Sequence, residues 1–64
     1  MAQLFFQYDE ITYFFDTKLL KLYRMEGNQS FEINNPEILW NVRLFSAEIS
    51  RKQALEMVSE RYPN

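Results

Sequence analysis

Three carboxylates near the start of the chain are the residues with the clearest potential for catalysis or metal binding. Asp9 and Glu10 lie between two aromatic segments and Asp16 ends the second, so a hairpin could bring them together. Carboxylates act as general acids and bases and as ligands of hard cations. The chain has no His and no Cys, however, which removes the usual base near neutral pH and the soft metal ligands.

Turns also select Asp for hydrogen bonds to nearby backbone groups. We therefore expect no catalytic site, no metal and no cofactor, and we interpret these carboxylates as turn residues. Ser46 and Ser50 have no base near them in the sequence and are interpreted as helix caps.

A second group of residues could bind single-stranded nucleic acid. Lys18, Lys21 and Arg24 supply cations, and Tyr23 between them could stack on a base. Such proteins gain most of their affinity by neutralising phosphates. Seven Lys and Arg against nine Asp and Glu give a net charge of −2, which offers little of that attraction. Nucleic-acid binding is therefore the alternative prediction.

The third candidate is an apolar stripe on the back of an expected helix. At 100° per residue, Trp40 and Leu44 project from one side of residues 36–45. The opposite side carries the residues expected to cover a sheet: Ile38, Val42 and Phe45, with Leu39 beside them. A short chain cannot easily bury both sides of a helix, and a leftover apolar stripe is usually an interface, with Arg43 at its rim. The alternative is that Trp40 belongs to the core, between the sheet and the last helix.

The elements that must position these residues follow from hydrophobic periodicity. Alternating apolar residues predict strands over about 3–8 and 11–15, joined by an Asp-Glu turn instead of the favoured Asn-Gly. Residues 16–27 fit either a helix or a strand over 20–25. We prefer the strand, because a two-stranded ribbon with so much aromatic surface is marginal. Residues 31–33 are a candidate fourth strand.

Neither face of this predicted sheet is polar, because Phe5 and Phe14 fall on the face opposite Phe6, Tyr13 and Phe15. We therefore expect one side of the sheet to need a second cover.

Two helices follow in the sequence. Asn35, Pro36 and Glu37 begin a helix over 36–45, as an N-cap, a first-turn proline and a carboxylate at the positive end of the helix dipole. Ser50 and Gln53 can form a capping box for a helix over 50–62. That helix is expected to bury one stripe of residues: Ala54, Leu55, Val58 and Tyr62. A break is expected over 46–49.

The 64 residues thus predict one small α+β domain, with an antiparallel sheet of three or four strands followed by two helices packed on one face. We expect a non-catalytic interaction or regulatory protein that binds a protein partner or itself, most simply as a homodimer. The first residues lack the pattern of a signal peptide and every apolar run is too short for a bilayer span, so we expect a cytoplasmic protein and no membrane contact. Small phage-encoded or accessory bacterial regulators share this general profile.

Overall fold

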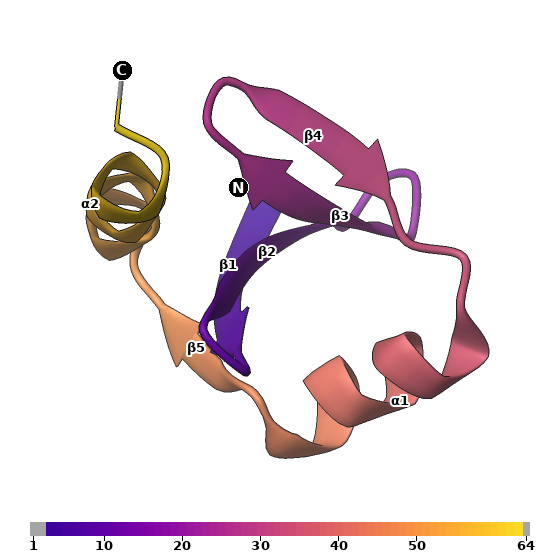
Figure 1. Ribbon diagram of the computed structural model, residues 1–64. Helices are drawn as coiled ribbons and strands as arrows, with labels where there is room; N and C mark the ends of the chain where they lie inside the picture. Colours follow the sequence, from indigo (N-terminus) through magenta and orange to yellow (C-terminus); the bar gives the residue numbers. More distant parts are fainter. Residues whose placement is uncertain (1–2, 64) are drawn as a thin grey trace.

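The computed structural model describes residues 3–63, which form a five-stranded sheet and two helices (Figure 1). In chain order the elements are β1 (Gln3–Tyr8), β2 (Ile11–Asp16), β3 (Lys21–Glu26), β4 (Gln29–Glu32), α1 (Pro36–Phe45), β5 (Ala47–Ile49) and α2 (Arg51–Arg61). The strands lie in the order β4-β3-β2-β1-β5, and every neighbouring pair is antiparallel. The predicted α+β class is confirmed.

The first four strands form a meander in which each strand pairs with the next. Phe5 lies opposite Phe14 in β1 and β2, and Phe15 lies opposite Leu22 in β2 and β3. The helical alternative for residues 16–27 is therefore wrong. The fourth strand begins at Gln29, two residues earlier than predicted, because Gly27 adopts a positive φ of 62° and allows a tight turn after β3.

The structure has a fifth strand, β5, whereas the sequence predicts only three or four strands. After α1 the chain returns to β1, where Ile49 lies opposite Phe5 and Ala47 opposite Gln7. The expected break over 46–49 is present, and the chain uses it to add an edge strand. The two helices therefore do not both follow the sheet, since β5 lies between them.

The two helices cover opposite faces of the sheet (Figure 1), so the prediction that both pack on one face is wrong. On one face, Tyr13 and Leu22 form a core cluster with Val42 of α1. Phe5 and Phe14 alternate onto the other face, which α2 covers. The physical reason is that β1 and β2 carry aromatic side chains on both faces, and each face needs an apolar cover.

Aromatic side chains pack closely on both sides of the central strands. On the face toward α2, the rings of Phe14 and Tyr23 stack with centroids 4.8 Å apart, and Phe5 lies 6.2 Å from Phe14. On the other face, burial raises the pKa of Tyr13, and the positive charge of Arg24 opposes that shift.

The helix α2 uses a narrower apolar stripe than the sequence predicts. Ala54 and Val58 are buried and Tyr62 is half-buried, but Leu55 is 50% exposed. Residues four apart lie on one line along a helix, whereas Leu55 is rotated about 100° from Ala54 and so points past the edge of the contact.

Both helix starts form as the sequence predicts. The Asn35 side chain accepts a hydrogen bond from the Glu37 N–H at 2.9 Å. At α2, the Gln53 N–H donates to the Ser50 hydroxyl at 3.1 Å, and the Ser50 N–H donates to the Gln53 side chain at 3.0 Å. Each cap satisfies backbone groups that the helix itself leaves without a partner.

Replacing Ser50 with Ala should lower the free energy of unfolding by about 1 kcal/mol, because the Gln53 N–H loses its acceptor. Urea melts followed by circular dichroism measure this. Ser59, an exposed residue inside α2, provides the control, since Ser59→Ala should be neutral or slightly stabilising. Equal midpoints for wild type and Ser50→Ala would show that the cap contributes nothing.

The turns at the two ends of β2 place ordinary residues in the left-handed backbone region. Asp9 and Glu10 have φ of 52° and 64°, and Leu20 has φ of 56°. In the second turn the Asp16 carboxylate accepts hydrogen bonds from the N–H groups of Lys18 and Leu19, both at 2.9 Å. Side chains with a Cβ cost roughly 1–2 kcal/mol per residue in this region, and Gly and Asn tolerate it best.

The double substitution Asp9→Asn, Glu10→Gly should therefore raise the free energy of unfolding by about 1 kcal/mol, because it supplies the residue pair that a two-residue hairpin with positive φ favours. The urea midpoint is the measurement. As a control, Gln29→Gly places glycine in β4, outside the turn, and should be destabilising. A lower midpoint for the turn variant would contradict the assignment of this turn.

Candidate functional site

Four large apolar residues of α1 are exposed. We call these residues, Leu39, Trp40, Leu44 and Phe45, the α1 face. The side chains of Trp40 and Leu44 are 59% and 60% exposed, so Trp40 is not part of the core of a single chain. On the inner side Val42 is buried and Ile38 is half-buried against the sheet.

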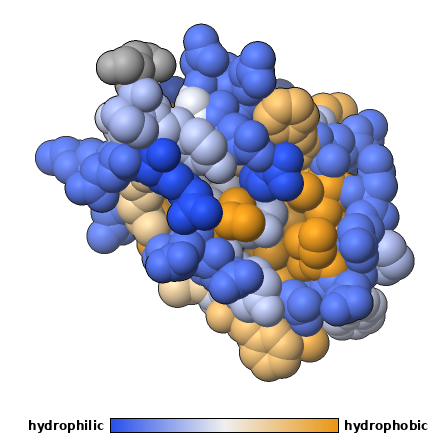
Figure 2. All heavy atoms as spheres, viewed as in Figure 1, coloured by the Kyte–Doolittle hydropathy of each residue, from blue (hydrophilic) through white to orange (hydrophobic). Residues whose placement is uncertain are grey.

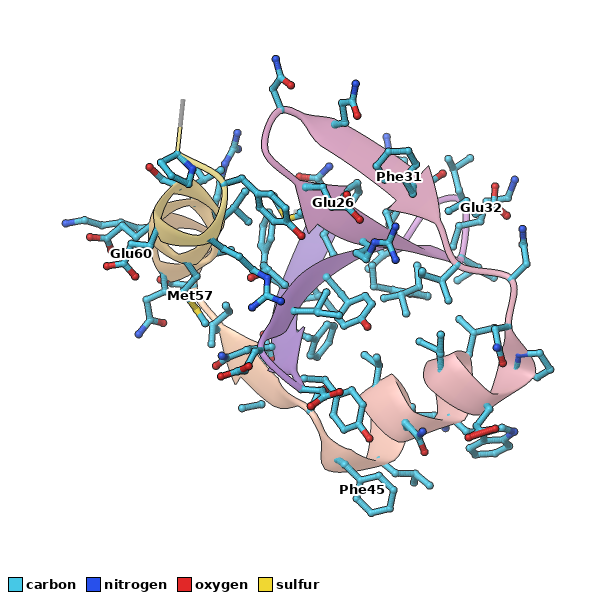
Figure 3. All side chains as sticks on the ribbon, in the orientation of Figure 1. Glu26, Phe31, Glu32, Phe45, Met57 and Glu60 are labelled. Atoms are coloured by element: carbon cyan, nitrogen blue, oxygen red, sulfur yellow. The ribbon has the colours of Figure 1, made fainter. Side chains whose placement is uncertain are left out.

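Phe45 departs from its predicted place among the residues that cover the sheet. Its side chain is 68% exposed and projects away from the sheet (Figure 3). Phe45 is the last residue of α1, where Ser46 ends the helix by donating hydrogen bonds from its N–H and its hydroxyl to the carbonyl of Val42. The chain then turns into β5 at Ala47, and the Phe45 ring is left exposed. The α1 face is larger than predicted as a result.

Arg43, the residue expected at the rim of the stripe, lies near Trp40. Its guanidinium carbon is 5.9 Å from the centre of the Trp40 ring, a distance suited to a cation–π contact. The two ion pairs found among residues 3–63 are Lys21–Glu32 and Arg24–Glu26, so Arg43 has no carboxylate partner there. The guanidinium therefore keeps its hydrogen-bond donors available to an external group.

A hollow of about 350 Å³ lies between α1 and the sheet. Figure 2 shows hydrophobic residues at the surface in this region. The lining residues come from three strands and the helix: Phe6, Phe15, Leu22, Leu39, Val42 and Arg43. A shallower depression of about 190 Å³ adjoins it, lined by Pro36, Leu39, Trp40 and Arg43. Sequence periodicity identifies these apolar residues but carries no information on the gap between helix and sheet, so the hollow is not predictable from it.

The three carboxylates considered for catalysis do not converge. Asp9 and Glu10 precede β2 and Asp16 ends it, which places the two groups about 20 Å apart at 3.3 Å per residue. The Asp16 carboxylate is occupied by its hydrogen bonds to Lys18 and Leu19. Within residues 3–63 no three acidic, His or Cys residues cluster in a way that could hold a metal ion.

The four residues considered for nucleic-acid binding are also separated. Strand alternation places Lys21 and Tyr23 on the face toward α2, and Arg24 on the opposite face. Lys21 pairs with Glu32 at 3.6 Å, and Tyr23 stacks on Phe14. Lys18 lies in the loop between β2 and β3.

The guanidinium of Arg24 also has neighbours within the chain. Arg24 lies within ion-pair distance of Glu26, although its Nε lacks the alignment of a hydrogen bond, and its guanidinium is 5.5 Å from the Phe31 ring centre. Figure 3 shows Glu26 and Phe31 in this part of the sheet. The fold thus does not join these cations and the aromatic ring into one surface.

Two further findings bear on function. None of the helices within residues 3–63 is long and apolar enough to cross a membrane. Comparison with protein-family models, with curated proteins and with solved structures finds no match for this chain.

Proposed function

We propose that the chain is a non-catalytic interaction protein that binds a second protein through the α1 face, most simply another copy of itself. The observation that carries this proposal is the exposure of Trp40 and Leu44 on a helix whose other side already covers the sheet. An exposed Trp beside apolar residues, with an Arg at the rim, has the composition of an interface centre.

The balance of buried and exposed apolar residues supports the proposal. Within residues 3–63, six apolar residues are buried: Phe5, Tyr13, Leu22, Val42, Ala54 and Val58. Nine large apolar residues are exposed, four of them on the α1 face. Single exposed apolar residues are ordinary, but four of them on one ten-residue helix are a concentration of the kind that marks contact sites.

The test is a double substitution, Trp40→Gln with Leu44→Gln, examined by size-exclusion chromatography with light scattering. We expect wild type at twice the 7.8 kDa chain mass and the variant at the chain mass, with an unchanged circular dichroism spectrum. The two side chains are expected to contribute about 2 kcal/mol or more each at the contact centre. Because both are already exposed, their loss should not unfold the monomer.

Leu55→Gln is the matched control, because Leu55 is a half-exposed leucine on α2, outside the α1 face. It should leave the wild-type mass unchanged. A double variant that remains dimeric would place the interface elsewhere. Wild type that stays monomeric at about 100 µM would exclude a stable homodimer, since specific association at micromolar Kd is complete there; the α1 face would then have to bind a different protein.

A further inference from the structure

We propose that the hollow between α1 and the sheet binds a small aliphatic carboxylate, with its chain in the hollow and its carboxylate on Arg43. The site shares Leu39 and Arg43 with the proposed interface but has a different centre. Trp40 and Leu44 project outward from α1, whereas the hollow lies beneath the helix, among residues of β1, β2 and β3. Its occupant is a small molecule and not a protein.

The lining specifies the apolar part of the ligand. Five of the six lining residues are apolar: Phe6, Phe15, Leu22, Leu39 and Val42. Leu22 and Val42 belong to the core cluster, and Phe6 and Phe15 pack against that cluster, so these walls are part of a formed structure. Ligand sites are concave, mostly apolar and largely pre-formed, with a few polar groups that fix orientation.

The volume limits the size of the ligand. At about 350 Å³ the hollow is near the lower end of the 300–1,000 Å³ that ligand pockets span. Water occupies about 30 Å³ per molecule in the liquid, so the hollow holds roughly ten non-hydrogen atoms at similar density. A straight-chain acid of about eight carbons has that number.

Arg43 specifies the charged end. It is the sole charged residue in the lining, so no carboxylate of the wall would repel an anion. Its guanidinium rests against the Trp40 ring and has no acidic partner within residues 3–63. A planar guanidinium matches a carboxylate with two parallel hydrogen bonds, and because Arg43 is exposed no ion pair has to be broken first.

Titration of the ¹³C-labelled protein with octanoate, followed by methyl NMR, tests the proposal. We expect saturable shifts centred on the methyl groups of Leu22, Leu39 and Val42, with a Kd of roughly 0.1–1 mM for a ligand of this size. Octanol, which has the same chain without the charge, should bind at least fivefold more weakly.

Arg43→Gln is the decisive variant. It should weaken octanoate binding about five- to tenfold and leave octanol binding unchanged, because Arg43 is exposed and contributes charge rather than a core contact. Arg51→Gln is the matched control, since Arg51 is an exposed arginine at the start of α2, on the other side of the sheet, and it should bind octanoate as wild type does. Titration of the single variant Leu44→Gln separates the two proposals, because Leu44 belongs to the proposed interface but does not line the hollow, so octanoate binding should persist there whatever the oligomeric state.

Three results would overturn the proposal. One is the absence of saturable shifts up to about 10 mM octanoate, well above the expected Kd. A second is a set of shifts centred on Leu44 or Leu55, with none at Leu22 and Val42. The third is equal octanoate affinity in Arg43→Gln and wild type, which would mean that the chain length alone drives binding and that Arg43 does not recognise the carboxylate.

Discussion

Aromatic side chains on both faces of β1 and β2 determine the architecture of this chain. Phe5 and Phe14 occupy one face, and Tyr13 with its neighbours occupies the other. A sheet with one polar face could be completed by helices on a single side. Here each face needs its own helix, so the chain must cross from one face to the other after α1. The crossing segment is β5, which pairs with the free edge of β1.

Because each face of the sheet is covered by a different helix, each helix buries only a few of its side chains against the sheet. In α1 the inner contact is made chiefly by Val42 and Ile38, and α2 buries Ala54 and Val58. A contact this narrow cannot bury all the apolar side chains of a helix that is apolar on two sides. The α1 face and the hollow beneath the helix are thus two results of the same arrangement: α1 carries more apolar surface than its side of the sheet can bury.

Much of this fold can be predicted from the sequence, because strands and helix starts are indicated by residues close together in the chain. Alternation defines β1 and β2, and side-chain caps define the starts of both helices at Asn35 and Ser50. Helical geometry places Trp40 and Leu44 on the side opposite Val42, but it does not decide whether they are exposed or covered by another element. β5 escapes detection because three residues are too few for a periodic pattern, and its pairing depends on β1, far away in the chain. The placement of α2, the exposure of Phe45 and the hollow depend on tertiary packing, which periodicity does not encode.

The pairing of β1 with β5 has a consequence for the order of folding. Phe5 and Ile49 are 49 − 5 = 44 residues apart, whereas β1 to β4 are joined by short turns. Contacts between distant residues form slowly because closing a long loop costs entropy. During synthesis the meander therefore emerges first, with both aromatic faces uncovered until α1 and α2 arrive and the β1 edge unpaired until β5 arrives. That interval is the period in which the nascent chain is most exposed to aggregation and to capture by chaperones.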